Sequence, residues 1–359
     1  MVHIYQRIAE GGVRLSKAKQ DEETRKVQFT GGSTYIISLP KRWIVQNQLK
    51  RGSFIKLREE EDGLMTIVPP GSVLEKKLEE AAIRVSQKDD PETVTRKIVS
   101  IYLAGYNSLS IIADRQQFSN KQRHDVKIFV RHMLVGTEIV TDTATQLTLQ
   151  VLLNYPELTI QNALRRMGII AASMHKDAIL ALKTHDSVLA KEVAITDNEV
   201  DRFNLFVNRQ LKISIQNPRV AKEIGLASSK DVLGYRLVTK SVERTADHAV
   251  SIADNVLSLK HDLNAGVIEK IENMSAIAIK MFDTAIDSLF RQDYNIAESI
   301  IKNVKDVRAL EREIVTSLQI DVEDAASLRL IIESIRRTAE YSSDIAETVL
   351  NMTVDSILV

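Results

Sequence analysis

The sequence predicts an α+β multidomain protein that is mainly α-helical, and three observations lead to this prediction. Seven of the 13 glycines and three of the six prolines fall within the first 71 residues, whereas four glycines and one proline follow Pro156. Turn-rich sequence therefore gives way to helix-rich sequence. From about residue 158 onward, apolar residues recur every three or four positions, which is the period of an amphipathic helix. A 14-residue pattern that begins at Ser241 also returns 93 residues later. We expect a β-rich N-terminal domain, a small α+β middle region and two related three-helix bundles.

The N-terminal domain is predicted over residues 24–70, after an N-terminal extension at 1–23. A turn with Gly31 and Gly32 separates its first two strands. Pro40 ends the second strand and opens a short helix, since proline is tolerated in the first helical turn. The predicted elements are strands at 25–29 and 34–39, a helix at 41–49, and strands at 54–57 and 64–68 around an acidic turn.

The middle region is predicted over residues 71–153, and its sequence mixes helical and strand patterns. The sequence assigns no function to it. Its predicted helices lie at 91–104 and 120–134, and its predicted strands at 108–112, 138–140 and 146–151.

The helical part is predicted as two tandem three-helix bundles, over residues 154–260 and 261–359. Short connections between its helices favour antiparallel neighbours. The stretch Ser241–Asp254 lines up with Ser334–Glu347, which identifies an internal repeat of about one three-helix unit. The six predicted helices lie at 158–184, 187–215, 228–259, 263–291, 293–318 and 325–356.

Composition and motifs exclude several classes of protein. Lys plus Arg and Asp plus Glu are both 48, so the formal net charge is zero and only the distribution of charge is informative. There is no cysteine, hence no disulfide framework and no thiolate metal site. The first residues lack the apolar run of a signal peptide, and no stretch approaches the length of a membrane span. We expect a cytoplasmic protein without direct membrane insertion.

No motif of a familiar enzyme class is present. The sequence contains no P-loop, no Gly-x-Gly-x-x-Gly after a strand and no His-Glu-x-x-His. No glutamate of the repeated helices is followed three residues later by histidine, as a ferritin-like di-iron site requires. His175, His185 and His248 are single histidines on helices, which are more often core or surface residues than catalysts. We expect no enzymatic activity.

Positive charge is concentrated in the N-terminal domain. Between Thr24 and Arg58 there are eight basic residues and no acidic one. Such asymmetry in a chain of zero net charge is typical of a surface that binds phosphate backbones, although a solvated basic surface without a partner is the alternative. The eight residues are Arg25, Lys26, Lys41, Arg42, Lys50, Arg51, Lys56 and Arg58.

Carboxylates gather on one face of each repeated helix. At about 100° per residue, Glu243, Asp247 and Asp254 lie within roughly 40° of one another, and the three acids of the last helix within roughly 60°. Three carboxylates on one face repel unless a cation lies there, and oxygen ligands suit Mg²⁺, Mn²⁺ or iron. A solvated outer face is the alternative. The acids of the last helix are Glu340, Asp344 and Glu347.

The order of residues in the N-terminal domain resembles the SpoVT/AbrB-like family, a swapped-hairpin β-rich domain. The resemblance rests on GGSTYIISLPKRW at 31–43, LKRGS at 49–53 and DGLMTIVP at 62–69. It implies a homodimer formed through this domain and DNA binding by basic residues, although some members use the domain only for dimerisation or partner binding. The implied DNA-binding residues are Arg25, Lys26, Lys41, Arg42, Lys50 and Arg51.

The helical part resembles the PhoU family of phosphate-uptake regulators. The resemblance rests on ERTADHAVSIAD at 243–254 and on the stretches ALRRM at 163–167, MHKDA at 174–178 and DNEVDR at 197–202. It implies two tandem three-helix bundles, each with a Glu-x-x-x-Asp motif that holds a metal cluster. The combination resembles archaeal-type PhoU proteins with an N-terminal AbrB-type domain. The implied ligands of a divalent metal or iron are Asp197, Asp201, Glu243 and Asp247.

The second repeat departs from this pattern. Arg336 stands at the position of Glu243, and Glu340 at that of Asp247. When the second helices of the two repeats are aligned, Val304 and Arg308 stand at the positions of Asp197 and Asp201. Since an arginine supplies a cation of its own, we expect metal in the first bundle, with Glu340, Asp344 and Glu347 as the candidates for a second site.

Three functional hypotheses follow. In the leading one, the protein is a dimeric, phosphate-responsive transcriptional regulator with PhoU-like bundles as sensor or partner module. In the second, it is an adaptor that restrains a phosphate transporter through the ATPase subunit, and the AbrB-like domain serves dimerisation alone. In the third, it is a metal-binding helical protein with another activity. Salt-dependent DNA binding separates the first from the other two.

Overall fold

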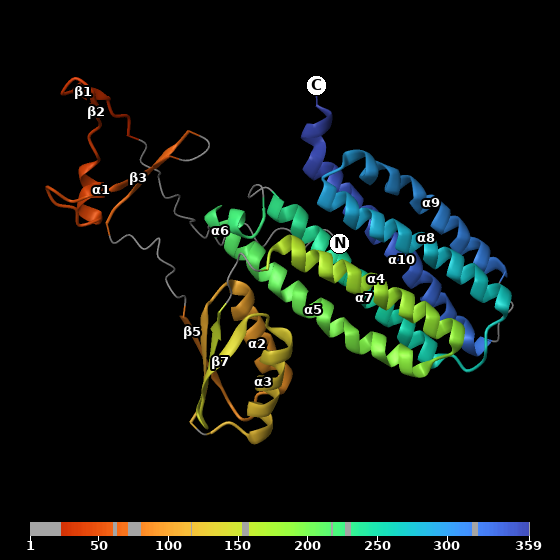
Figure 1. The fold of residues 1–359 in the computed structure, drawn as a ribbon. Coiled ribbons are helices and arrows are strands. Elements are labelled where there is room, and N and C mark those ends of the chain that lie inside the picture. Colours follow the sequence, from red (N-terminus) through yellow and green to blue (C-terminus); the bar gives the residue numbers. More distant parts are fainter. Residues whose placement is uncertain are drawn as a thin grey trace, which may run out of the picture. The chain divides into compact units, whose positions relative to one another are not determined.

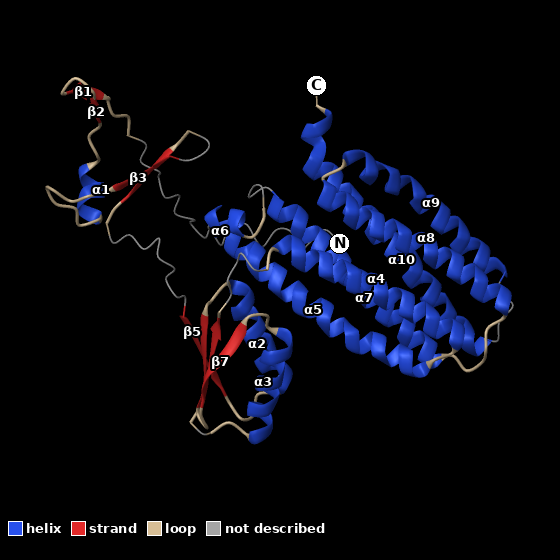
Figure 2. Ribbon diagram, in the orientation of Figure 1, coloured by secondary structure: helices blue, strands red, loops and turns tan. Residues whose placement is uncertain are grey.

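A computed structural model describes residues 23–59, 63–70, 80–115, 117–152, 158–216, 218–226, 231–317 and 322–358. The chain divides into two compact units, residues 1–77 and 78–359. The predicted N-terminal extension lies outside the described residues, apart from residue 23. As predicted, the fold is a multidomain α+β arrangement that is mainly helical (Figures 1 and 2).

The described residues of the N-terminal unit form two separate antiparallel hairpins and one short helix. Strands β1 (Gln28–Thr30) and β2 (Thr34–Ile36) pair with Phe29 opposite Tyr35, and β3 (Lys56–Glu59) pairs with β4 (Met65–Val68). Helix α1 (Lys41–Gln46) begins directly after Pro40. Gly31 and Gly32 have φ of 63° and 80°, a conformation that side chains with a Cβ rarely adopt. Strands β1, β2 and β4 are shorter than the sequence predicted, and β3 has the predicted length but begins two residues later.

The middle region forms a four-stranded mixed sheet in the order β5-β6-β8-β7. Strands β5 and β6 are parallel and joined through α2, whereas β6, β8 and β7 are antiparallel neighbours. Helices α2 and α3 cover one face of the sheet (Figure 2). The elements are β5 (Glu80–Val85), α2 (Pro91–Ala104), β6 (Ser108–Ala113), α3 (Asn120–Met133), β7 (Thr137–Asp142) and β8 (Gln146–Val151).

The six long helices that the sequence predicted are all present, and their ends differ from the predicted ones by at most three residues. A short helix, α6 (Pro218–Glu223), was not predicted. The first bundle contains α4 (Ile160–Thr184), α5 (Ser187–Gln216) and α7 (Asp231–Ser258). The second contains α8 (Ala265–Arg291), α9 (Tyr294–Ser317) and α10 (Val322–Thr353), and a 3₁₀ turn (Val354–Ile357) follows it.

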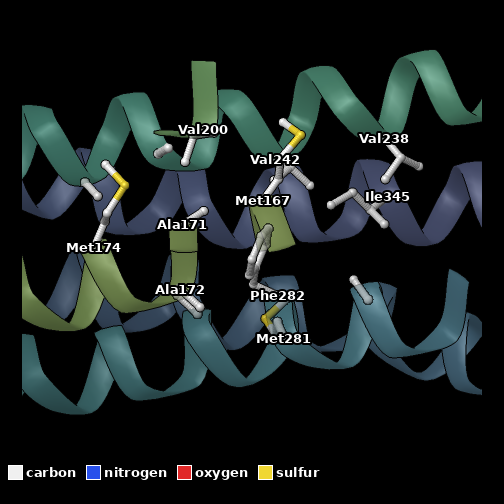
Figure 3. Close-up of a cluster of buried hydrophobic side chains, with 14 of the residues drawn as sticks. Met167, Ala171, Ala172, Met174, Val200, Val238, Val242, Met281, Phe282 and Ile345 are labelled. Atoms are coloured by element: carbon white, nitrogen blue, oxygen red, sulfur yellow. The ribbon is translucent and has the colours of Figure 1, made fainter. Parts of the chain in front are cut away.

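The two bundles share one continuous hydrophobic core. Figure 3 shows part of it, where Met167 of α4, Val242 of α7, Phe282 of α8 and Ile345 of α10 gather between the helices. The repeated helices α7 and α10 pack along each other, so residues at equivalent repeat positions meet. The rings of His248 and Tyr341, for example, have centroids 5.6 Å apart. The internal repeat is therefore visible as an interface between equivalent helices.

Arg209 of α5 connects the first bundle to the middle region through hydrogen bonds. Its side chain is buried, and it donates hydrogen bonds to the carbonyl oxygens of Tyr102 and Gly105 and to Oδ1 of Asn107, the last at 2.9 Å. The guanidinium also lies 4.8 Å from the centroid of the Tyr102 ring, a cation–π distance. The middle region and the bundles consequently form one compact unit.

Candidate functional site

The four acids that the sequence predicted as metal ligands lie on two neighbouring helices of the first bundle. Asp197 and Asp201 are one turn apart on α5, and Glu243 and Asp247 are one turn apart on α7. Residues four apart share a helix face, and α5 packs along α7, so the two pairs face each other. The structure thus brings all four carboxylates into mutual electrostatic contact.

Partial burial, together with crowding of like charge, changes the acidity of this cluster. Partial burial, and then Asp201, Asp247 and Glu243, raise the pKa of Asp197 to about 7. Asp247 is exposed, yet partial desolvation and Glu243 raise its pKa to about 6. The pKa of Asp201 is raised as well, chiefly by desolvation and by Glu243. The cluster therefore holds negative charge at an electrostatic cost, which a bound cation would relieve.

Lys240 already supplies one cation to this acidic cluster. It lies on α7, one turn before Glu243, and donates a hydrogen bond to Glu243 Oε2. The sequence analysis did not single out Lys240, although its spacing of three residues from Glu243 places it on the same helix face. Asp254, which the pattern grouped with Glu243 and Asp247, is exposed at the surface.

The donor set fits a hard cation, but it does not form a finished coordination shell. Carboxylate oxygens suit Mg²⁺, Mn²⁺ or iron. Oδ1 of Asp197 is buried without a hydrogen-bond partner among the described residues, so it is available as a ligand. Within the part of the chain that the structure describes, however, no three His, Asp or Glu side chains converge closely enough to hold an ion. Metal binding here remains a prediction that requires side-chain rotation.

The equivalent place in the second bundle is dominated by arginine. Glu340 of α10 accepts hydrogen bonds from Arg308 at 3.0 Å, Arg336 at 2.6 Å and Arg337 at 3.0 Å. Burial would raise the pKa of Glu340, but these three bonds outweigh it, and the pKa lies below its ordinary value. Arg308 lies opposite Glu340, in agreement with the alignment of the second helices.

Asp344 and Glu347 are exposed on α10. Of the three candidate acids in the second bundle, Glu340 is the one that forms ion pairs with arginine among the described residues. Partial burial and the neighbouring Glu340 raise the pKa of Asp344.

The single histidines lie in structural positions. His175 is fully buried, with Nε2 2.9 Å from Ser275 Oγ. His248 lies between α7 and α10, with Nδ1 3.1 Å from Ser334 Oγ. His185 ends α4 in a left-handed conformation and lies 3.4 Å from Asp262.

The predicted DNA-binding residues are all exposed in the N-terminal unit. Lys41 and Arg42 occupy the first turn of α1, and Arg25 pairs with Glu23 just before β1. The six residues are Arg25, Lys26, Lys41, Arg42, Lys50 and Arg51.

The same unit carries apolar side chains that the single chain does not bury. None of the described side chains at 23–57, 59 and 63–70 is buried. Phe54 is 90% exposed and Tyr35 is 72% exposed, whereas side chains of this kind normally lie inside a fold. The exposed apolar residues are Val27, Phe29, Tyr35, Ile36, Ile37, Val45, Phe54, Leu57, Leu64 and Met65.

Comparison with known families and proteins agrees with this organisation. The PhoU domain model matches residues 164–256 and 271–349, one match in each bundle. The model "Antidote-toxin recognition MazE, bacterial antitoxin" matches residues 28–75. Among the described residues, no helix combines the length and the apolar character of a membrane span.

The similar curated proteins are named phosphate-specific transport system accessory protein PhoU homologs. The one from Clostridium acetobutylicum is 22% identical over 200 residues, which covers 53% of this chain and 89% of the relative. The one from Pseudomonas aeruginosa is 25% identical over 204 residues, which covers 53% of this chain and 81% of the relative. Among solved structures, the phosphate transport system regulatory protein PhoU from Streptococcus pneumoniae is 17% identical, with a TM-score of 0.48, and covers 56% of this chain and 96% of that one.

Fold and site together define a class of protein with two tandem three-helix bundles, charged clusters at equivalent repeat positions and a separate β-rich N-terminal domain. The chain contains two PhoU domains, one in each bundle, and it carries a MazE/AbrB-like domain at its N-terminus.

Proposed function

We propose that the protein is a dimeric, phosphate-responsive transcriptional regulator of the cytoplasm, which acts by binding rather than by catalysis. The N-terminal domain would contact DNA, and the two PhoU bundles would serve as the sensor or partner module. The link to phosphate is carried over from the names of the relatives.

One observation carries the proposal: the N-terminal unit combines exposed basic residues with exposed apolar ones. Apolar surface that one chain leaves in water favours pairing with a second copy. Pairing would bring two sets of basic residues together, and each lysine or arginine that neutralises a phosphate releases counterions from DNA. A dimeric basic surface of this kind suits a duplex better than it suits a small anion.

The test is a DNA titration of the full-length protein at two salt concentrations. We expect the affinity to fall steeply with salt, with a slope of log K against log salt of about −0.9 for each neutralised phosphate. Lys41→Ala/Arg42→Ala should lose most of the affinity. Lys121→Ala/Arg131→Ala removes two exposed charges from α3 and serves as the matched control, which should bind like the wild type. Absence of DNA binding at low salt would refute the regulator.

A second candidate function is an adaptor that restrains a phosphate transporter. The names of the similar curated proteins favour it, since they refer to an accessory protein of a phosphate-specific transport system. In this case the N-terminal domain would serve dimerisation alone. Retention of the full-length protein by the transporter's ATPase subunit in a pull-down, together with no binding of DNA, would favour the adaptor.

We further propose that Asp197, Asp201, Glu243 and Asp247 hold a divalent metal or iron in the first bundle. The cation would neutralise the crowded carboxylates and stabilise the pairing of α5 with α7. Addition of Mn²⁺ or Fe²⁺ should raise the melting temperature of the wild type but not that of Asp197→Asn. Asp254→Asn, a change at an exposed acid of the same helix α7, should keep the response, and an equal response in all three proteins would refute the site.

A further inference from the structure

A positively charged groove lies on the second bundle, between α9 and α10. It has a volume of about 700 Å³ and contains four cationic side chains but only two carboxylates. Its lining residues are Lys305, Arg308, Glu311, Arg312, Arg336 and Glu340.

Three of the cations form a stripe along α9. Lys305, Arg308 and Arg312 are spaced at i, i+3 and i+7, so they lie on one face over roughly 10 Å of helix. All three are exposed. Among the described residues, Lys305 and Arg312 form no ion pair, whereas Arg308 pairs with Glu340. Two cations at the ends of the stripe are therefore available to a ligand.

Both carboxylates of the groove are already engaged by arginine. Glu311 accepts a hydrogen bond from Arg336 Nε at 3.0 Å. Glu340 accepts from Arg336 and Arg308, and also from Arg337 beside the groove. These pairs hold Arg336 and Arg308 in position and leave an excess of two positive charges in the groove.

The internal repeat makes this excess informative. Arg336 and Arg308 occupy the positions that Glu243 and Asp201 occupy in the first bundle, where the cluster is acidic. Guanidinium and ammonium groups gathered on one surface repel one another unless an anion lies between them. The second bundle thus presents the electrostatic complement of a cation site.

We propose that this groove binds an oxyanion of the phosphate class, either inorganic phosphate or a short polyphosphate. The fixed fork of a guanidinium matches two oxygens of a phosphate, and a lysine ammonium adds a mobile point charge. Arg312 and Lys305 would provide the free donors, beside the positioned Arg308 and Arg336. The choice of phosphate among oxyanions rests on the proposed function, whereas the cationic groove itself does not.

The test is calorimetric titration of the full-length protein with orthophosphate, tripolyphosphate and sulfate in a low-salt chloride buffer. The wild type should bind a phosphate more tightly than sulfate. Lys305→Ala/Arg312→Ala should weaken binding roughly tenfold or more, because each lost donor makes a charge-assisted hydrogen bond. Both residues are exposed and unpaired within the described chain, so the variant should fold normally, as circular dichroism can verify.

Lys121→Ala/Arg131→Ala is again the matched control, since it removes one lysine and one arginine from another exposed helix. It should bind phosphate like the wild type. Tighter binding of orthophosphate than of tripolyphosphate would identify the free anion as the ligand. Tighter binding of tripolyphosphate would identify a phosphate chain. No binding of either, or equal binding by the groove variant, would overturn the proposal. Binding of polyglutamate without binding of phosphate would overturn it too, in favour of an acidic protein partner.

DNA titration of the same groove variant separates this inference from the proposed function. In phosphate-free buffer the variant should bind DNA like the wild type. A wild type that binds DNA but does not bind phosphate would refute the proposed phosphate site alone. Phosphate binding by a wild type that does not bind DNA would refute the regulator and leave the groove standing.

Discussion

The buried ring of His175 gives the protein a pH dependence that belongs to a single residue. Its Nε2 lies 2.9 Å from Ser275 Oγ of α8, and its Nδ1 lies 3.4 Å from Thr338 Oγ1 of α10. Burial first, and then the charges of Lys176 and His248, lower the pKa of His175 from 6.5 to about 3. Between these two values the unfolded chain binds a proton that the native ring does not bind. Folding is therefore disfavoured as the pH falls through this window.

His175→Gln should make the stability of the protein less sensitive to acid. In the wild type, this histidine should lower the free energy of unfolding by up to about 1.4 kcal/mol for each pH unit below 6.5. Glutamine keeps an amide that can hydrogen-bond but has no ring to protonate. Urea unfolding of both proteins at pH 7 and pH 5 measures the difference, in which the other titrating groups cancel. An equal loss of stability in both proteins would show that His175 does not contribute.

At the scale of secondary-structure elements, the docking of the middle region depends on one side chain of α5. Arg209 satisfies three acceptors at the end of α2 and in the turn after it. Its substitution would leave the partly buried carbonyl of Gly105 and the amide oxygen of Asn107 without this donor. A buried polar group without its partner costs about 1–3 kcal/mol.

Arg209→Ala should loosen the contact between the middle region and the first bundle. Amide hydrogen exchange should become faster at the end of α2 and in the following turn, with little change in α9. Arg209→Lys should rescue little, because a lysine cannot reach three acceptors with a fixed fork. Exchange rates that stay unchanged in Arg209→Ala would show that the apolar contacts of α2 and α3 hold the region without the arginine.

Elements with local, periodic patterns could be predicted from the sequence, and elements that depend on distant pairing could not. The spacing of apolar residues located the six long helices, and α2 has the predicted ends because Asp90 caps it, Pro91 begins it and Gly105 ends it. Strand β5 was missed, because its partner β6 begins at Ser108, and the pairing across α2 leaves no local signal. Helix α6 was missed because its six residues are too few to show a period.

The candidate site was predictable in its acids but not in its cations. Helical spacing grouped Glu243 with Asp247, and the resemblance to the PhoU family placed Asp197 and Asp201 of the neighbouring helix opposite them. The engagement of Glu340 by three arginines depends on rotamers and on the packing of α9 against α10, which a one-dimensional pattern does not contain. The alignment of the two repeats indicated one of these cations in advance, because it placed Arg336 at the position of Glu243.

At the scale of the whole molecule, the proposed dimer depends on the apolar surface of the N-terminal unit. Phe54 is 90% exposed in a unit whose described side chains are all unburied. Removing such a side chain from water is worth roughly 1.5–3 kcal/mol, and an interface with a partner would bury it.

Phe54→Asp should convert a dimer into monomers, because a buried carboxylate without a partner strongly disfavours the interface. Sedimentation velocity at micromolar concentration measures the change. Val188→Asp alters an apolar side chain on α5 that is 69% exposed, and it should leave the assembly unchanged. A wild type that sediments as a monomer would refute the dimer.

The acidic cluster of the first bundle and the arginine-rich cluster of the second bundle have opposite charge, which affects how the helical unit responds to an electric field. The whole chain has a formal net charge of zero, so a distant charged partner neither attracts nor repels it as a monopole. Carboxylates crowd one bundle at the positions where guanidinium groups crowd the other, and the two bundles share one hydrophobic core. Opposite charges held apart in this way form a dipole, and a dipole in a field experiences a torque. A charged surface would therefore exert a torque on these two clusters of the helical unit before any contact forms.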